Sequence, residues 1–97
     1  MSVGTVKVRL RLAENHSLKG KRQVVKSIIA RVQNRFNVSI AEIEDQDHWQ
    51  VATLGIACIS NDGRQVNRVL SQVVEFIANS RMEAELVDHD MEILPGP

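Results

Sequence analysis

Cysteine, proline and aromatic residues are all scarce in this chain. Its 97 residues include one cysteine (Cys58), two prolines, one tryptophan, two phenylalanines and no tyrosine. The single cysteine excludes a disulfide framework and a metal site made of several thiolates. No apolar run approaches the roughly 18 residues that a membrane-spanning helix needs, so we expect no transmembrane helix, and no signal peptide either. We therefore expect one cytoplasmic domain over residues 1–97.

Net charge is also absent, but the two halves of the chain differ. Residues 1–40 hold nine of the twelve basic residues and one acidic residue, whereas residues 41–97 hold three basic and eleven acidic residues. Halves of opposite sign suggest either an anionic partner or pairing of the two halves with each other.

Hydropathy patterns divide the chain into six elements. Alternating apolar residues predict a strand over residues 3–12, and helical spacing from Val25 to Phe36 predicts a helix that begins after an N-cap at Ser17. The remaining elements follow in order: a strand over residues 38–44, a turn over 45–50, a strand over 51–60, a helix containing 66–77 and a last strand over 87–93.

The order β-α-β-β-α-β corresponds to two split βαβ units. It predicts an α+β fold, a ferredoxin-like split βαβ sandwich. The four-stranded antiparallel sheet would have the order 4-1-3-2, with two helices on one face. From the right-handed crossover rule we also expect the first and third strands to be parallel neighbours. Both helices would then begin at the same edge of the sheet, and the turn over residues 45–50 would lie at the opposite end of the third strand.

The predicted sheet brings opposite charges together on its open face. The bases of the first strand would lie across from the acids of the last strand, that is Lys7, Arg9 and Arg11 across from Asp88, Asp90 and Glu92. The apolar residues of the last strand, Val87, Met91 and Ile93, would face the helices. Cross-strand pairs of opposite charge stabilise a sheet by roughly 0.2–1 kcal/mol each. We expect these cross-strand pairs, which form a charge ladder, to neutralise much of the charge difference between the two halves within the protein.

The start of the first helix differs, because Lys19, Lys21 and Arg22 are cations where the helix dipole disfavours positive charge. Exposed helix amides, a glycine without a side chain and several cations together favour an oxyanion. An ordinary solvated helix start is the alternative. The predicted phosphate- or RNA-binding residues are Lys19, Gly20, Lys21, Arg22, Arg11, His16 and Arg64.

The turn over residues 45–50 is the other cluster rich in functional groups. Its carboxylates and His48 are compatible with a metal, but a solvated turn is the simpler interpretation, and we predict no metal site. Trp49 either packs on the sheet edge or anchors a partner. The candidate partner contacts are Asp45, Asp47, Trp49 and Gln50.

No catalytic residue emerges from the sequence. There is no nucleophile elbow, phosphate-binding loop or dinucleotide fingerprint, and Cys58 is expected in the core without a base nearby. Phe36 and Phe76 occupy core-facing positions, so we expect no aromatic platform for stacking bases. We predict no cofactor.

Several motifs together resemble the YlxP-like family, a small bacterial family of unknown function. The resemblance covers nearly the whole chain and rests on runs including His16-Ser17-Leu18-Lys19, Arg35-Phe36-Asn37-Val38, Asp45-Gln46-Asp47 and Ala52-Thr53-Leu54-Gly55. It implies a ferredoxin-like fold and a cytoplasmic bacterial protein. Members are often encoded beside translation and ribosome-maturation factors, which implies a ribosome-associated role. The family has no established activity, so no catalytic residue follows from it.

The leading hypothesis is a non-enzymatic domain that binds RNA or a ribosomal particle through phosphate backbone. A homodimer through the open sheet face, with small residues such as Thr53, Gly55 and Ala57, is the second hypothesis. A phosphometabolite site at the two helix N-termini is the third, for which His16 is the only available general base.

Overall fold

The computed structural model describes residues 1–80 and 83–95 of the chain. They form six elements in the expected order, each where the hydropathy pattern predicted it. The elements are β1 (Ser2–Arg11), α1 (Leu18–Arg35), β2 (Ser39–Glu44), β3 (Val51–Ser60), α2 (Gly63–Asn79) and β4 (Glu85–Pro95).

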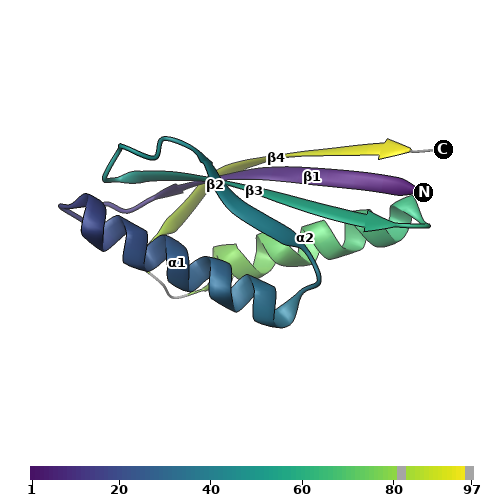
Figure 1. Cartoon of the computed structure of the whole chain (residues 1–97), viewed down its shortest axis with the longest axis horizontal. Helices are drawn as coiled ribbons and strands as arrows, with labels where there is room; N and C mark the ends of the chain where they lie inside the picture. The colour runs from purple at the N-terminus through teal and green to yellow at the C-terminus, as the bar shows by residue number, and fades with distance from the viewer. Residues whose placement is uncertain (81–82, 96–97) are drawn as a thin grey trace.

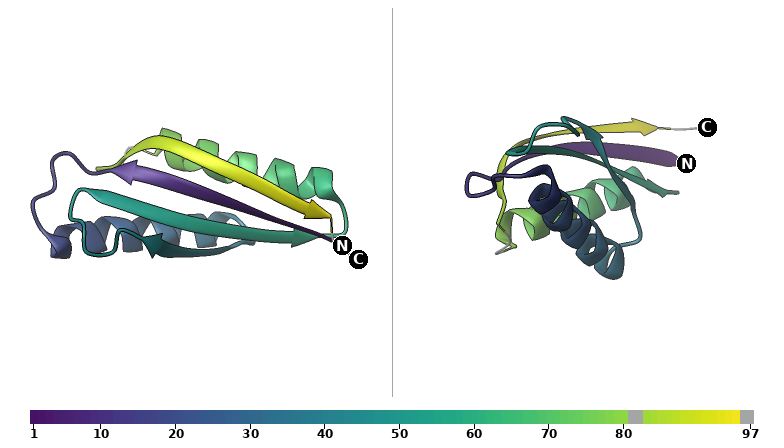
Figure 2. Two further views of the ribbon diagram at one scale, coloured as in Figure 1. Left: turned by 90° about the horizontal axis from the view of Figure 1, so that it is seen from above. Right: turned by 60° about the vertical axis from the view of Figure 1, so that its left-hand side comes forward.

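The four strands form one antiparallel sheet, and both helices lie on one of its faces (Figure 1, Figure 2). The strand order β2-β3-β1-β4 is the expected order 4-1-3-2 from the other edge, so the predicted ferredoxin-like class is confirmed. The other face of the sheet is not covered by any described element, and we call it the open face.

One expectation about strand direction was wrong, because β1 and β3 are antiparallel. The crossover through α1 joins β1 to β2, which are parallel to each other since each is antiparallel to the β3 strand between them. α1 therefore begins at the end of the sheet where β1 finishes, and α2 begins at the opposite end, where β3 finishes. This correction changes which residues can share a site.

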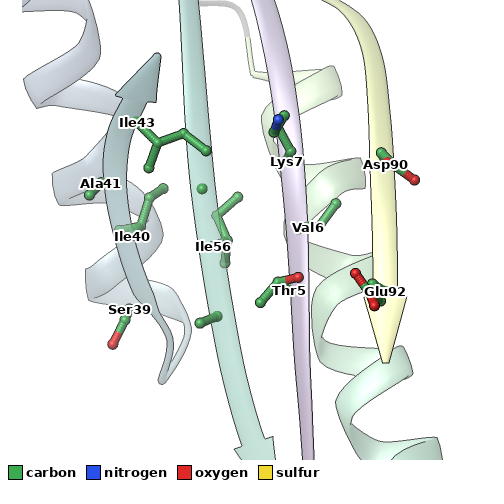
Figure 3. A pocket seen from close by; sticks show the side chains of 12 residues that line it. Thr5, Val6, Lys7, Ser39, Ile40, Ala41, Ile43, Ile56, Asp90 and Glu92 are labelled. Atoms are coloured by element: carbon green, nitrogen blue, oxygen red, sulfur yellow. The ribbon is translucent and has the colours of Figure 1, made fainter. Parts of the chain in front are cut away.

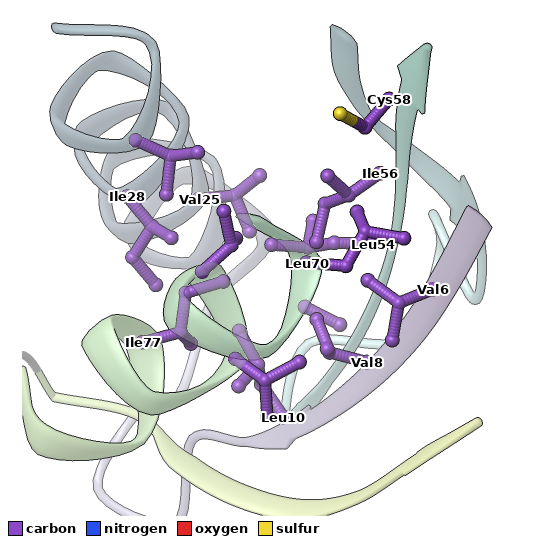
Figure 4. Packing of buried hydrophobic residues seen from close by; sticks show 14 of the residues in the cluster. Val6, Val8, Leu10, Val25, Ile28, Leu54, Ile56, Cys58, Leu70 and Ile77 are labelled. Atoms are coloured by element: carbon purple, nitrogen blue, oxygen red, sulfur yellow. The ribbon is translucent and has the colours of Figure 1, made fainter. Parts of the chain in front are cut away.

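The core lies between the sheet and the helices (Figure 4). Period-2 alternation turns one side of each central strand inward, and helical spacing turns one stripe of each helix toward it. The buried apolar residues are Val6, Val8, Leu10 and Leu12; Val25, Ile28 and Val32; Ala52, Leu54, Ile56 and Cys58; and Val66, Leu70, Val73, Val74 and Ile77.

β4 pairs with β1 through a register step that skips Val87. A bulge of this kind turns the following residues onto the other face. Leu86 takes the inward position and packs against the core, while Val87 is 53% exposed. The expectation that Val87 faces the helices was therefore wrong, whereas Met91 and Ile93 pack against the core as predicted.

The open face carries the expected ladder only in part. Arg9 Nη1 lies 3.0 Å from Asp88 Oδ2, and the two residues are paired across the strands. Lys7 is also in register with Asp90, but its Nζ forms an ion pair with Glu44 of β2 at 2.7 Å. The acids of β4 are thus not all neutralised by β1.

Candidate nucleic-acid interface

The segment between β1 and α1 begins the helix as predicted. Ser17 is the N-cap, and its Oγ accepts a hydrogen bond from the Gly20 amide at 3.0 Å. Asn15 folds over this turn and donates through Nδ2 to the carbonyls of Ser17 at 2.7 Å and Trp49 at 2.5 Å. A Cβ at residue 20 would overlap the Asn15 side-chain oxygen, so packing explains this glycine. The Gly20 amide is occupied by the cap, and the expectation that it is free for an anion was wrong.

Lys21 is buried, with only 1% of its surface exposed. Its Nζ donates to the carbonyls of Asp45 at 2.5 Å and His48 at 2.7 Å, and lies 2.8 Å from Glu42 Oε2. Since three oxygens of the protein surround the ammonium, Lys21 joins α1 to β2 and to the turn that follows β2. Its expected role as a ligand for an external phosphate was wrong.

The turn over residues 45–50 lies beside the start of α1. The expectation that it lies at the end of the sheet away from this helix start was wrong. The antiparallel pairing of β1 with β3 places Val51 across from Arg11, at the end where α1 begins. Asp45 has a left-handed backbone (φ 62°), and its Oδ2 accepts a hydrogen bond of 2.7 Å from the buried Thr53 hydroxyl. Thr53 is consequently not part of an accessible small-residue surface.

Gln50 and Trp49 connect the turn to the segment before α1. Gln50 Nε2 donates to the carbonyls of Ala13 and Asn15, at 3.3 Å each, and the Gln50 carbonyl accepts a 2.8 Å hydrogen bond from Leu12. Of the four candidate partner contacts, Asp45 and Gln50 therefore have structural roles. Asp47 is exposed, and Trp49 is 50% exposed.

The exposed cations of α1 form the most prominent charged surface at this end. α1 contains no acidic residue in 18 positions. Lys19, Arg22 and Lys26 follow one another at helical spacing i, i+3 and i+7, and all are exposed. None of the three has an ion pair within residues 1–80 and 83–95. We call these three residues the basic stripe.

Two further cations lie on the flank of α1 that faces α2. Arg31 and Arg35 line a groove of about 870 Å³ between the C-terminal parts of the helices. The Arg35 guanidinium lies 5.2 Å from the ring centre of Phe76 and 6.0 Å from that of Phe36. The two rings pack edge to face, so they are half-buried and serve packing as expected.

Of the remaining candidate residues, Arg11 and Arg64 lie away from the basic stripe. His16 is exposed in the segment directly before α1. Arg11 lies at the same end but on the open face, in register with Glu85 of β4. Arg64 begins α2 at the opposite end of the sheet, and its Nε lies 3.6 Å from Asp62 Oδ1. The expectation that both helix starts share one anion-binding edge was therefore wrong.

Chemistry beyond charge is sparse in the part of the chain that the structure describes. It contains no group of three His, Cys, Asp or Glu side chains placed to hold a metal ion. Burial raises the pKa of the Cys58 thiol, which disfavours the nucleophilic thiolate. Among these residues, none of the helices has the length and apolar character needed to cross a membrane.

A family described as "Protein of unknown function (DUF503)" matches residues 3–91 of the chain. The chain belongs to this family. Its similarity to "Uncharacterized protein YlxP" of Bacillus subtilis (strain 168) is 52% identity over 61 residues, which cover 63% of this chain and 66% of YlxP. The aligned part thus spans just under two thirds of that relative. The family resemblance inferred from the motifs is confirmed.

A solved structure with a TM-score of 0.47 and 9% identity is also similar to this DUF503 member. It is described as "LarC2, the C-terminal domain of a cyclometallase involved in the synthesis of the NPN cofactor of lactate racemase, apo form". The similarity covers 97% of this chain and 55% of the other chain.

Sequence reasoning missed the basic stripe as a unit in this DUF503 chain. The sequence prediction grouped Lys19, Lys21 and Arg22 in the first turns of the helix and did not include Lys26. The helical spacing of Lys19, Arg22 and Lys26, together with the absence of acids from α1, was visible in the sequence. The inward direction of Lys21 was visible too, since it shares the spacing of the buried Val25 and Ile28.

Proposed function

We propose that the protein binds the phosphate backbone of RNA, free or within a ribosomal particle, through the basic stripe. The observation that supports this is a row of three exposed cations, unpaired among residues 1–80 and 83–95, on a helix that has no acidic residue. Lys7, Arg9 and Lys21 each pair with a carboxylate of the protein, whereas the three stripe residues have no such partner in the described part of the chain. The protein's own fold leaves this positive charge uncompensated.

The basic stripe is electrostatically unfavourable in the isolated protein. Lys19 and Arg22 are in the first turns of α1, where the helix dipole opposes cations by roughly 0.3–1 kcal/mol each. Like charges three and four residues apart add a few tenths of a kcal/mol. A polyanion along α1 removes both penalties, and the stripe spans about 10 Å of the helix axis. Several phosphates of one strand can therefore contact it together.

Trp49 is a candidate stacking residue beside this backbone contact. It is half-exposed, and its backbone carbonyl is bound by Asn15 just before α1. Stacking of a base on an exposed aromatic ring is worth roughly 1–3 kcal/mol and tolerates any base. A contact of this kind would favour single-stranded RNA, because only unpaired bases are free to stack.

The test uses Trp49 as its own reporter, because it is the single tryptophan. RNA of about 15 unpaired nucleotides is titrated into the protein, and quenching of tryptophan fluorescence is followed at several salt concentrations. The variant Lys19→Glu with Arg22→Glu should weaken binding at least tenfold. It should also reduce the slope of affinity against salt by about two phosphate contacts.

Arg64→Glu with Arg68→Glu is the matched control, since it reverses two exposed cations of α2. It should change RNA affinity less than threefold. Equal loss in both variants, or binding that does not depend on salt, would contradict the proposal. In a bacterial lysate at low salt, the wild type should co-sediment with ribosomal particles, and the α1 variant should remain at the top of the gradient.

The phosphometabolite hypothesis has lost its geometric basis. It required two helix starts at one edge, but α1 and α2 begin at opposite ends of the sheet. The Gly20 amide and the Lys21 ammonium are also occupied by the protein's own groups. The extended cationic surface of α1 is better suited to a polymer than to a small anion.

A further inference from the structure

The open face of the sheet contains a groove on the side opposite the helices. It has a volume of about 540 Å³ and crosses all four strands (Figure 3). We call it the sheet groove, and its walls and floor include Ala41 and Ile43 of β2, Gly55 and Ala57 of β3, and Asp90 and Glu92 of β4.

One half of the sheet groove is apolar. Gly55 and Ala57 form a low floor, and Ile43 rises beside them with 43% of its surface exposed. A Cβ at residue 55 would lie 3.0 Å from Ile43 Cγ2, so the glycine keeps the floor open next to this side chain. The surface is suited to an aliphatic side chain that packs against Ile43.

The other half of the sheet groove is acidic. Lys7, the cation nearest to Asp90 in register, is instead bound to Glu44 at 2.7 Å. Asp90 and Glu92 form no ion pair with any residue that the structure describes. The two carboxylates therefore form the β4 side of the groove without an ion pair in the described part of the chain, and Thr5 and Lys7 of β1 lie between them and the apolar floor.

A second copy of the chain would fit this face poorly. A two-fold axis along the strands would set β4 of one copy over β2 of the other, and the acids would lie against Ala41 and Ile43. An axis across the strands would bring the Asp90 and Glu92 pairs of the two copies together. Burying unpaired carboxylates costs several kcal/mol, so both arrangements are disfavoured.

We propose that the sheet groove binds an extended cationic segment of another protein, with an aliphatic side chain on Ile43 and a lysine or arginine between Asp90 and Glu92. Three strand spacings separate β2 from β4, which is about 14 Å. In an extended peptide, residues four apart face the same side and lie about 13–14 Å apart. The segment therefore lies across the strands, with its aliphatic and basic residues four positions apart.

The test measures fluorescence anisotropy with two labelled nonapeptides. Both have leucine at the third position and serine or threonine elsewhere, but one has arginine at the seventh position and the other has glutamate. The arginine peptide should bind saturably, at least tenfold more tightly than the glutamate peptide. Asp90→Asn with Glu92→Gln should remove that difference.

The control variant is Glu83→Gln with Glu85→Gln, which removes the same charge at the start of β4, outside the groove. It should change the affinity for the arginine peptide less than twofold. Equal affinity for the two peptides, no saturable binding up to millimolar concentration, or equal loss in both variants would overturn the proposal. So would a dimer in light scattering that Ile43→Glu dissolves, because the face would then belong to a second copy.

Discussion

Lys21 shows how a single residue can hold three segments together. Its side chain is among the largest that the fold buries completely, and its ammonium contacts Glu42 and the carbonyls of Asp45 and His48. A buried cation is tolerated only where such partners replace water. Removing the ammonium leaves the Glu42 carboxylate and two carbonyls without their partner.

We therefore predict that Lys21→Met lowers the free energy of unfolding by about 3 kcal/mol, because breaking a buried ion pair strands the other charge. Lys26→Met, on the exposed side of the same helix, should change it by no more than about 0.5 kcal/mol. Urea denaturation followed by circular dichroism measures both. A loss below about 1 kcal/mol for Lys21→Met would show that the contacts of Lys21 do not stabilise the fold.

Cys58 yields a prediction about pH. Burial raises the pKa of its thiol, so the folded protein keeps the neutral form where the unfolded chain ionises. The neutral thiol therefore makes its full contribution to the free energy of unfolding below the thiol pKa of the unfolded chain. That free energy should decline as the pH rises above about 8.5. At pH 8, a disulfide reagent should modify the folded protein roughly 100-fold more slowly than the protein in guanidinium chloride. Similar rates in the two conditions would mean that the thiol is accessible in the folded state.

At the scale of elements, the contact between β1 and α2 depends on a missing side chain. Gly4 faces α2, and a Cβ there would overlap Val66 and lie 2.8 Å from Leu70 Cδ1. Gly63, by contrast, begins α2, and its nearest neighbour for a Cβ would be Ser2 Oγ at 3.4 Å. The two glycines are therefore expected to respond differently to the same substitution.

We expect Gly4→Ala to destabilise the protein by about 1–3 kcal/mol, because the added methyl group pushes α2 away from the sheet. Gly63→Ala should be neutral or stabilise by up to about 1 kcal/mol, because alanine favours the helix. Thermal denaturation of the pair tests this. Equal changes in the melting temperature of the two variants would indicate that the space between Gly4 and α2 can hold a methyl group.

The elements were predictable from periodicity, and the antiparallel sheet was predicted correctly, but the first and third strands were wrongly expected to be parallel. Ser17 and the alternation of β1 place the strand, the N-cap and the helix correctly, since these are local properties. The direction of β3 against β1 is a non-local property, because a crossover joins β1 to β2 and β3 lies between them. The crossover rule applies to β1 and β2, which α1 connects. Applied to the neighbouring strands β1 and β3, it predicts the wrong end of the sheet for Arg64 and for the turn over residues 45–50.

The candidate site was predictable only where its residues act independently. The exposure of Lys19 and Arg22 follows from helical spacing, and it is confirmed. The structural role of Lys21 depends on its partners, and two of them are carbonyls of a turn more than 20 residues away in the sequence. Backbone carbonyls carry no signature in a sequence, so no pattern of side chains indicates that this cation is already bound.

At the scale of the whole molecule, the uncompensated charges are separated by the sheet. The basic stripe belongs to α1 in the helical layer, and the acidic half of the sheet groove lies on the open face. A helix is about 10 Å across, so the layers hold the two surfaces further apart than the roughly 8 Å over which charges interact at physiological salt. The neutral net charge is thus the sum of a basic surface that favours anions and an acidic surface that favours cations.

This separation predicts that the two proposed ligands bind independently at physiological salt. Saturating arginine peptide should change the dissociation constant for RNA less than twofold at 150 mM salt. At 10 mM salt the screening length grows to about 30 Å, so the bound cationic peptide should tighten RNA binding measurably. Fluorescence titrations with and without peptide give both values. A tenfold change at 150 mM salt would contradict independent surfaces, because screening leaves only direct competition or a conformational change to couple the two ligands.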